Sequence, residues 1–355
     1  MVGGGRRRAA VLGGVVAGAV LVSGIGLWAT DSWPFRDSYC WGAWEQDSGA
    51  SFLGDEALGK SGSERRATES APPSADRPHG TCTLAVTSEI EDDDSDRPLT
   101  FKEQITLEYG PVPAGDKERR AWIAQYFHGS ASPLPDGLDG LVASDRAMLV
   151  LPAECDADGR ASAVTIRSES VGDGHLGKVA MPFAIGNSAE VGRMLLDAAN
   201  TTMKKAGCAP GKPLRMTSPL VTVAEDDERA SNPLCRIPGV SFDFGQGSRY
   251  QQQVGAVTDR LQTCSVVWQT PREPDEPSAQ YVMARRPRLV AVFDGLPAGA
   301  AHGLLRASCG GRPTVFYGNV DTGLQGRGRP DDRRVFDRFT ESVGQRIGCG
   351  DGEDA

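Results

Sequence analysis

The stretch NSAEVGRMLLDAANTTMKKAGC, residues 187–208, contains the most clearly marked helix of the chain. It begins at a capping asparagine, carries apolar residues at helical spacing, and has two lysines in its last turn, where they oppose the helix dipole. A glycine ends the helix directly before Cys208. Residues 330–349, PDDRRVFDRFTESVGQRIGC, follow the same plan and end on the same Gly-Cys pair. This correspondence predicts an internal repeat.

Segments upstream of the two helices extend the repeat. Each copy contains a Cys-initiated strand, then a strand, a Pro-Ala-Gly turn and a helix, and then a second cysteine followed by a β-branched strand. We therefore predict an α+β fold: an N-terminal transmembrane helix followed by two similar disulfide-bonded domains, each an antiparallel sheet flanked by helices. The matched segments are CTLAVTSE (82–89) with CSVVWQT (264–270), ITLEYG-PVPAG-DKERRAWIAQYF (105–127) with LVAVFDG-LPAG-AAHGLLRAS (289–308), and ASAVTIRS (161–168) with PTVFYGNV (313–320).

The chain has eight cysteines, and all of them follow the apolar N-terminal segment. An even number in an oxidising compartment indicates four disulfides. There is no Cys-x-x-Cys motif and the four histidines are scattered, which argues against zinc and thioredoxin-like redox sites. The repeat predicts the pairs Cys40 with Cys82, Cys155 with Cys208, Cys235 with Cys264, and Cys309 with Cys349.

Residues 9–29 form an uncharged run, AAVLGGVVAGAVLVSGIGLWA, which as a helix is about 31 Å long and matches a bilayer core. Three arginines precede it and Asp31 follows it, so residues 1–8 are expected in the cytoplasm and the bulk of the chain outside. The alternative is a signal peptide cleaved after Ala29, where Leu27 fits the cleavage pattern poorly. We expect a single-pass membrane protein anchored through residues 9–29.

The remaining sequence divides into an extracytoplasmic domain at 36–211, a second at 212–350, and a disordered tail at 351–355. The segment after residue 212 is rich in Pro, Ser and acidic residues, as in a linker, and residues 61–81 have so little apolar content that we expect a mobile loop. After the apolar segment the chain has 35 basic and 47 acidic residues, a net charge of −12, which argues against binding to nucleic acid or to anionic lipid surfaces.

Cys40, the following Phe52-Leu53-Gly54, and Cys82-Thr83-Leu84 together resemble the opening of exported Cys-containing domains of actinobacterial, Streptomyces-like lipoproteins of unknown function. Leu234-Cys235 and Cys264 to Trp268 show the resemblance again. It implies a Mog1/PsbP-like fold, an antiparallel sheet flanked by helices, and an exported location. No lipobox is present, so anchoring would depend on the helix. The resemblance implies no catalytic residues.

Two segments match the residue pattern of a functional motif but lack the neighbouring residues that the motif needs. Residues 54–61, GDEALGKS, fit the P-loop pattern, but the residues that follow cannot form the helix that cradles phosphates. Asp92, Asp94, Asp96 and Glu103 have the spacing of calcium-loop ligands and are the candidate metal residues, yet Arg97 stands where the loop needs glycine. We expect a helix end in the first case and a solvated acidic hairpin in the second, and no bound cofactor or metal.

No hydrolase motif is present, although a catalytic triad is recognised by geometry and not by spacing. We therefore expect a non-catalytic envelope protein with a binding or assembly role, whose partner is an unknown envelope protein or ligand. One alternative is an envelope hydrolase with a dispersed site, and another is a calcium-stabilised adhesion or sensor module. If a site exists, we expect it at the seam between the two halves, where similar surfaces meet.

Overall fold

The structure, a computed structural model, describes residues 38–45, 50–59, 63–90, 99–172, 180–221, 233–240, 250–268, 277–320 and 332–349. The predicted anchor at 9–29 and both tails lie outside these ranges. Among the helices in the described ranges, none is both long and apolar enough to cross a membrane.

The first sheet has the strand order β3-β4-β5-β9-β8-β7-β6, and β10 pairs with β9. Every neighbouring pair is antiparallel. A short hairpin, β1 (Ser38–Tyr39) and β2 (Trp44–Glu45), precedes it. The strands are β3 (Glu64–Glu69), β4 (Gly80–Ile90), β5 (Leu99–Pro111), β6 (Ser132–Pro133), β7 (Gly140–Val142), β8 (Arg146–Val150), β9 (Ser162–Gly172) and β10 (Ala180–Met181).

The second sheet has the order β11-β12-β13-β15-β14, again antiparallel throughout. This is the order β3-β4-β5-β9-β8 of the first sheet, so the two halves share one sheet topology. The strands are β11 (Tyr250–Val257), β12 (Leu261–Trp268), β13 (Ala279–Ala284), β14 (Leu304–Cys309) and β15 (Arg312–Val320). We refer to residues 38–211 as the first copy and to residues 212–349 as the second copy.

The strand registers also coincide. In the first copy one row of paired residues runs through Cys82, Leu107 and Ile166. In the second copy the equivalent row runs through Cys264, Tyr281 and Gly318. Because both rows begin at the disulfide-bonded cysteine of the second strand, they align the two copies residue by residue, and Gly318 takes the position of Ile166.

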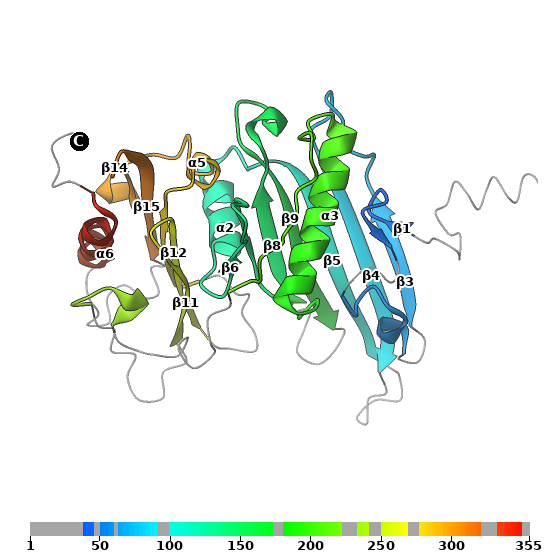
Figure 1. The fold of residues 1–355 in the computed structure, drawn as a ribbon. Helices are drawn as coiled ribbons and strands as arrows, with labels where there is room; N and C mark the ends of the chain where they lie inside the picture. Colours follow the sequence, from blue (N-terminus) through cyan, green and yellow to red (C-terminus); the bar gives the residue numbers. More distant parts are fainter. Residues whose placement is uncertain are drawn as a thin grey trace, which may run out of the picture.

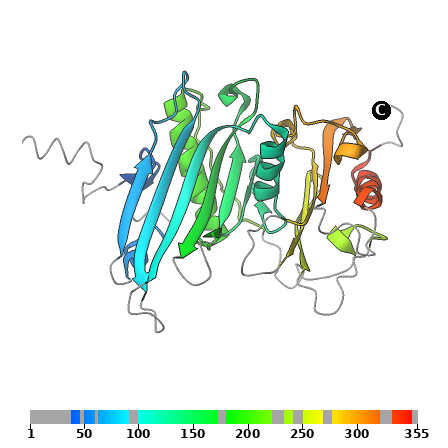
Figure 2. The ribbon, with the colours of Figure 1, turned by 180° about the vertical axis from the view of Figure 1, so that it is seen from behind.

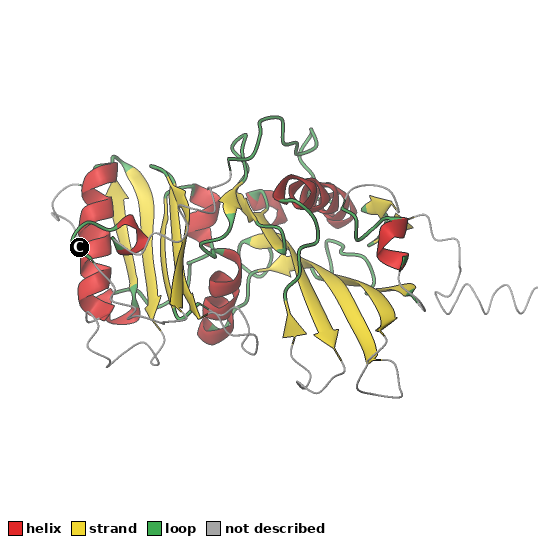
Figure 3. Ribbon diagram, turned by 90° about the horizontal axis from the view of Figure 1, so that it is seen from below, coloured by secondary structure: helices red, strands yellow, loops and turns green. Residues whose placement is uncertain are grey.

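The layers alternate along the long axis of the molecule. Helix α6 (Asp332–Ile347) covers the outer face of the second sheet, while α2 (Asp116–Tyr126) and the short α5 (Pro287–Ala291) lie between the two sheets (Figure 1, Figure 3). Helix α3 (Ser188–Ala206) crosses one face of the first sheet, and the view from behind shows strands β3, β4 and β5 without a helix over their other face (Figure 2).

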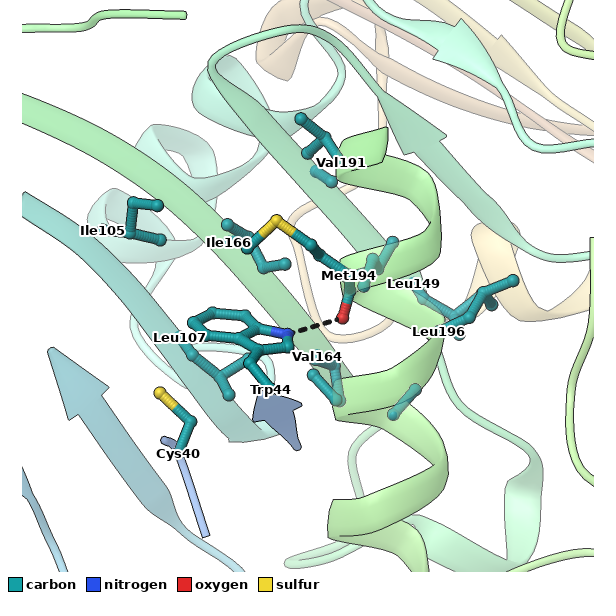
Figure 4. Close-up of a cluster of buried hydrophobic side chains, with 14 of the residues drawn as sticks. Cys40, Trp44, Ile105, Leu107, Leu149, Val164, Ile166, Val191, Met194 and Leu196 are labelled. Atoms are coloured by element: carbon teal, nitrogen blue, oxygen red, sulfur yellow. Dashed lines mark hydrogen bonds between the residues drawn. The ribbon is translucent and has the colours of Figure 1, made fainter. Parts of the chain in front are cut away.

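The α3 helix forms as its sequence predicts. Asn187 and Glu190 make a reciprocal capping box, and Gly207 ends the helix in the left-handed conformation with φ 76°. Its apolar face packs on β5, β8 and β9 together with the indole of Trp44, whose Nε1 donates to Met194 O at 3.0 Å (Figure 4). The indole therefore ties the N-terminal hairpin to the middle of α3.

A second core lies between the two copies. Buried residues of α2, β7, β8 and β9 pack against buried residues of α5, β13, β14 and β15 in one continuous cluster. Phe127 and Phe293 lie at its centre, with ring centroids 5.5 Å apart in an edge-on arrangement. The two copies thus share hydrophobic surface as well as forming cores of their own.

Polar contacts cross the same seam. Gln280 on β13 donates through Nε2 to Phe127 O at 3.0 Å and to Ile123 O and Ala124 O at 3.3 Å, so it caps the C-terminal carbonyls of α2. Arg119 on α2 donates through Nη1 to Val292 O at 2.6 Å, just after α5. Each of the two inner helices therefore has its C-terminal end satisfied by a side chain of the opposite copy.

The structure joins Cys40 to Cys82, Cys155 to Cys208, Cys235 to Cys264 and Cys309 to Cys349. These are the pairs that the repeat predicts. Both copies open with the same local geometry, because the first cysteine and the residue after it have positive φ: 54° and 62° at Cys40 and Trp41, and 55° at both Cys235 and Arg236. The backbone N–H of each cysteine donates to a side-chain oxygen of the following strand, Glu69 at 2.8 Å and Gln252 at 2.9 Å.

The predicted correspondence between residues 105–127 and 289–308 is wrong. LVAVFDG begins in helix α5 and not in a strand, and the strand equivalent to β5 is β13. A short apolar run does not distinguish a buried helix from a buried strand, and Pro287 at the first turn favours the helix. The predicted helix over AAHGLLRAS is instead a turn followed by β14, because Gly299 and Gly303 have positive φ of 122° and 62°.

The predicted mobile loop at 61–81 is wrong in part, since residues 64–69 form edge strand β3 and β4 begins at Gly80, while residues 70–79 connect the two strands. The side chains of β3 alternate between exposed and half-buried, and the inward ones are mostly polar. Arg65 donates through Nη2 to Phe52 O at 3.1 Å, and Glu69 accepts from Cys40 N. A charged edge strand protects the sheet from pairing with other chains, which explains its low apolar content.

Candidate functional site

A pocket of about 450 Å³ lies at the end of the second sheet, between β15, the start of α6 and the turn before β14. One lining residue, Arg120 of α2, comes from the first copy and reaches the pocket across the seam. Its volume is in the range of small-ligand sites. The lining residues are Arg120, Tyr281, Ala300, Ala301, His302, Gly303, Gly318, Asn319, Val320, Arg333 and Phe336.

Two glycines shape the floor of the pocket. Gly303 has φ 62°, and a Cβ there would lie 2.0 Å from Gly318 O. Gly318 N donates to Gly303 O at 2.8 Å, and a Cβ on Gly318 would meet the Phe336 ring at 2.5 Å. The backbone of β15, the turn and the ring therefore approach one another more closely than any side chain at these two positions allows.

Arg120 is held in place by its neighbours. Its Nη2 donates to His302 O at 3.1 Å, and its guanidinium carbon lies 5.6 Å from the centroid of the Tyr317 ring. Burial raises the pKa of the Tyr317 hydroxyl, and the positive charge of Arg120 opposes that rise. Because Gln280 fixes the C-terminal end of α2, the helix positions Arg120 against the second copy.

The pocket concentrates positive charge in an acidic protein. Two arginines, Arg120 and Arg333, line it beside His302, and its described lining contains no Asp or Glu, although the whole chain has a net charge of −9. Arginine donates several hydrogen bonds in a planar fork that matches carboxylate and phosphate groups. Tyr281 and Phe336, which are only 1% and 4% exposed, close the base of the pocket. The two arginines suit an anionic ligand.

No family model, no curated protein and no solved structure matches the chain. The function of the chain is therefore inferred from the geometry of the site.

The candidate calcium residues do not assemble in the described structure. Glu103 lies within β5, paired with Val86 on one side and Ser170 on the other, whereas Asp92, Asp94 and Asp96 lie outside the described residues. In the described ranges, no group of three or more acidic, His or Cys side chains could hold a metal ion.

The P-loop-like segment has the wrong surroundings for phosphate binding. Its described part is a single 3-10 turn, Asp55–Leu58, that ends at Gly59, and the chain continues into strand β3 instead of a helix. Lys60 and Ser61 lie outside the described residues. The dipole of a long helix, which the phosphate would need, is missing from this part of the described chain.

A Ser-His contact exists elsewhere, next to the seam. His128 Nδ1 lies 2.8 Å from Ser130 Oγ, but His128 is only 3% exposed. Burial and the nearby Arg146 lower the pKa of His128 to about 3, with Asp145 opposing them. An imidazole with so low a pKa is a poor acceptor for the proton of a serine nucleophile. The contact therefore lacks the basicity of a hydrolase dyad.

The sequence predicts that a site, if one exists, lies at the seam, but it singles out none of the residues that line this pocket. The predicted helical segments include Arg120, His302 and Arg333, but no sequence pattern gives any of the three a role. The signal was present in the repeat: aligning β15 with β9 places Gly318 where the first copy has Ile166, a change from a large apolar residue to none. That alignment requires the strand register, which the sequence alone did not supply.

Proposed function

We propose that the chain is a non-catalytic, membrane-anchored extracytoplasmic protein of the cell envelope. It binds an anionic ligand in the pocket between β15, the start of α6 and the turn before β14. The observation that carries this proposal is the gathering of Arg120, Arg333 and His302 around one concave site with no described carboxylate lining it. The four disulfides agree with an oxidising compartment. The uncharged run at 9–29, flanked by arginines and Asp31, is the sequence feature that supports anchoring.

The described surface favours the pocket over an apolar docking patch. The large apolar side chains exposed on it are Met181, 40% exposed, and Val221, 78% exposed. Two single residues do not form a contiguous patch of the size typical of protein interfaces. A concave charged site is therefore the better candidate for recognition.

Calorimetric titration of the full-length chain in detergent with inorganic phosphate tests the binding proposal. We expect saturable binding that weakens about tenfold in Arg120→Ala, because each charge-assisted hydrogen bond contributes about 1.5 kcal/mol or more. Arg334→Ala is the matched control, since Arg334 follows Arg333 on α6 and is exposed outside the pocket. Absence of binding, or equal weakening by both substitutions, contradicts the proposal.

Anchoring has a separate test. N-terminal sequencing of the protein in the membrane fraction should find residues 1–8 still attached. A mature chain that begins near Thr30 means that the segment is a cleaved signal peptide.

The second candidate function, an envelope hydrolase, has one observation in its favour, the Ser130–His128 contact. The test is turnover of ester and glycan model substrates by the purified protein. Turnover that is lost in Ser130→Ala would contradict the binding proposal and support the hydrolase. We expect no turnover, because the buried imidazole of His128 takes up a proton only near pH 3.

A further inference from the structure

His302, in the turn before β14, has an equivalent in the first copy. Met148 on β8 and Leu304 on β14 occupy the same place in the two sheets, because each pairs with the residue that precedes the aligned positions of β9 and β15. Arg146 and His302 each lie two residues before that place. A histidine therefore stands in the second copy where the first copy has an arginine.

In the first copy this arginine has its own counter-ion. Arg146 donates through Nε and Nη2 to Asp145 Oδ2 at 2.8 and 2.6 Å, and the two side chains are only 9% and 17% exposed. The residue before His302 is Ala301, so the second copy lacks a carboxylate at the equivalent position. A protonated His302 is therefore not neutralised by its neighbour in the turn, as Arg146 is.

The charged groups that the described pocket lining places around His302 are both arginines. Arg120 of α2 donates through Nη2 to His302 O at 3.1 Å, α6 contributes Arg333, and the lining residues of β15 are uncharged. The His302 side chain is exposed. Residues 321–331, which follow β15, lie outside the described ranges, and their two aspartates and two arginines give no net charge. The described lining thus offers no carboxylate to a protonated imidazole.

We propose that His302 makes anion binding depend on pH, so that the pocket binds its ligand more tightly in mildly acidic conditions and releases it as the pH rises. The inference rests on the proposed anion-binding function and names how that site is regulated. Histidine is the side chain whose charge ordinarily changes between pH 5 and 8. A bound anion takes the place of the carboxylate that Asp145 supplies in the first copy, and it offsets the repulsion between Arg120 and a protonated His302. Because the anion favours the protonated imidazole, protonation must favour the anion to the same extent.

Calorimetric titration of the full-length chain in detergent with sulfate at pH 5.5 and at pH 8.0 tests the inference. Sulfate carries the same charge at both pH values, so a change in affinity comes from the protein. We expect sulfate to bind about tenfold more tightly at pH 5.5, because a hydrogen bond from a charged donor is stronger than one from a neutral donor. His79→Gln, at an exposed position outside the pocket, is the control and should keep this pH dependence.

Two substitutions of His302 should remove the pH dependence in opposite ways. His302→Gln has no charge at either pH and should bind sulfate weakly at both. His302→Arg, which installs the residue of the first copy, should bind sulfate tightly at both. Equal loss of affinity in the two variants would mean that His302 only shapes the turn, and it would overturn the inference.

Ala301 provides an independent test that leaves His302 in place. Ala301→Asp installs the carboxylate of the first copy and should weaken sulfate binding about tenfold at pH 5.5. Ala301→Asn has nearly the same shape without the charge and should leave the affinity unchanged. Equal affinities of these two variants would show that a carboxylate beside His302 does not compete with the anion, which contradicts the inference.

The wild-type titrations separate this inference from the proposed function. Sulfate binding that is equal at pH 5.5 and pH 8.0, in a chain whose circular dichroism spectrum is the same at both, refutes the role of His302 and leaves the proposed function standing. Absence of sulfate binding at both pH values removes both.

Discussion

Gln280 and Phe127, one from each copy, are joined by a hydrogen bond of 3.0 Å from the amide Nε2 to the carbonyl oxygen. The same nitrogen lies 3.3 Å from two further carbonyl oxygens of α2, so one buried amide of β13 caps the helix that carries Arg120. The orientation of the pocket wall thus depends on a contact between the copies.

Replacing Gln280 by alanine should therefore weaken both stability and binding. We expect a loss of about 1–3 kcal/mol in the free energy of unfolding, because buried carbonyls of α2 lose their donor. Urea unfolding measures it, and Gln345→Ala, an exposed glutamine of α6, is the control. A loss no greater than that of the control would show that the cap contributes little.

The two copies should unfold together. Their shared core and the seam contacts of Gln280 and Arg119 couple them, so we expect one cooperative transition by circular dichroism and by tryptophan fluorescence. A fragment comprising residues 212–350 alone would expose the seam surface and should fail to give dispersed amide signals in NMR spectra. Two separate transitions in the intact chain would contradict this coupling.

Stability should fall as the pH decreases from about 6.5 to about 3, with His128 as one cause. Burial lowers the pKa of folded His128 to about 3, whereas an unfolded histidine titrates near 6.5. Between these values the unfolded state binds one more proton than the folded state. The free energy of unfolding therefore decreases by up to about 1.4 kcal/mol for each pH unit. His128→Gln should flatten this part of the urea-stability profile, while His79→Gln, at an exposed position, should leave it unchanged.

Asp136 should hold the segment after the first copy against α3 and β7. Its carboxylate accepts from Ser218 N at 2.9 Å and from the Thr217 hydroxyl at 3.0 Å. Hydrogen bonds from Ser218 and Thr217 place the pKa of Asp136 well below its usual range. We therefore expect the contact to persist as the pH falls through the ordinary aspartate range and to be lost only at still lower pH.

Limited proteolysis measures this contact. Asp136→Ala should speed cleavage within residues 212–221 at pH 7. Asp158→Ala is the control, because Asp158 is also an aspartate at positive φ, 53° against 55°, but lies in a different turn. Equal cleavage rates in the two variants would show that Asp136 does not hold the segment.

Removal of the Cys155–Cys208 disulfide by serine substitution at both positions should cost about 3–4 kcal/mol, because the bond closes a long loop in the unfolded chain. Urea unfolding of the variant measures the cost. Peptide mapping without reduction should find the same four pairs in the native protein. A bridge between the two copies would contradict both the pairing and the internal repeat.

Some features of the fold could be predicted from the sequence, and others could not. The closing helices could be predicted because caps, terminal glycines and apolar spacing are local signals. The role of LVAVFDG could not, because helix and strand are both compatible with a short buried apolar run. The polar strand β3 was missed because its inward side chains, Arg65 and Glu69, are satisfied by backbone groups distant in sequence.

The sequence by itself determined the two closing helices, the repeated order of cysteines and the disulfide pairs that follow from it. Each of these depends on residues whose meaning is set by neighbours along the chain. Only the tertiary structure decided that the copies share a core, that Gly318 replaces Ile166, and that Arg120 meets Arg333 and His302 around one pocket. The physical reason is that strand register and helix docking arise from contacts between distant segments, whose geometry no local pattern specifies.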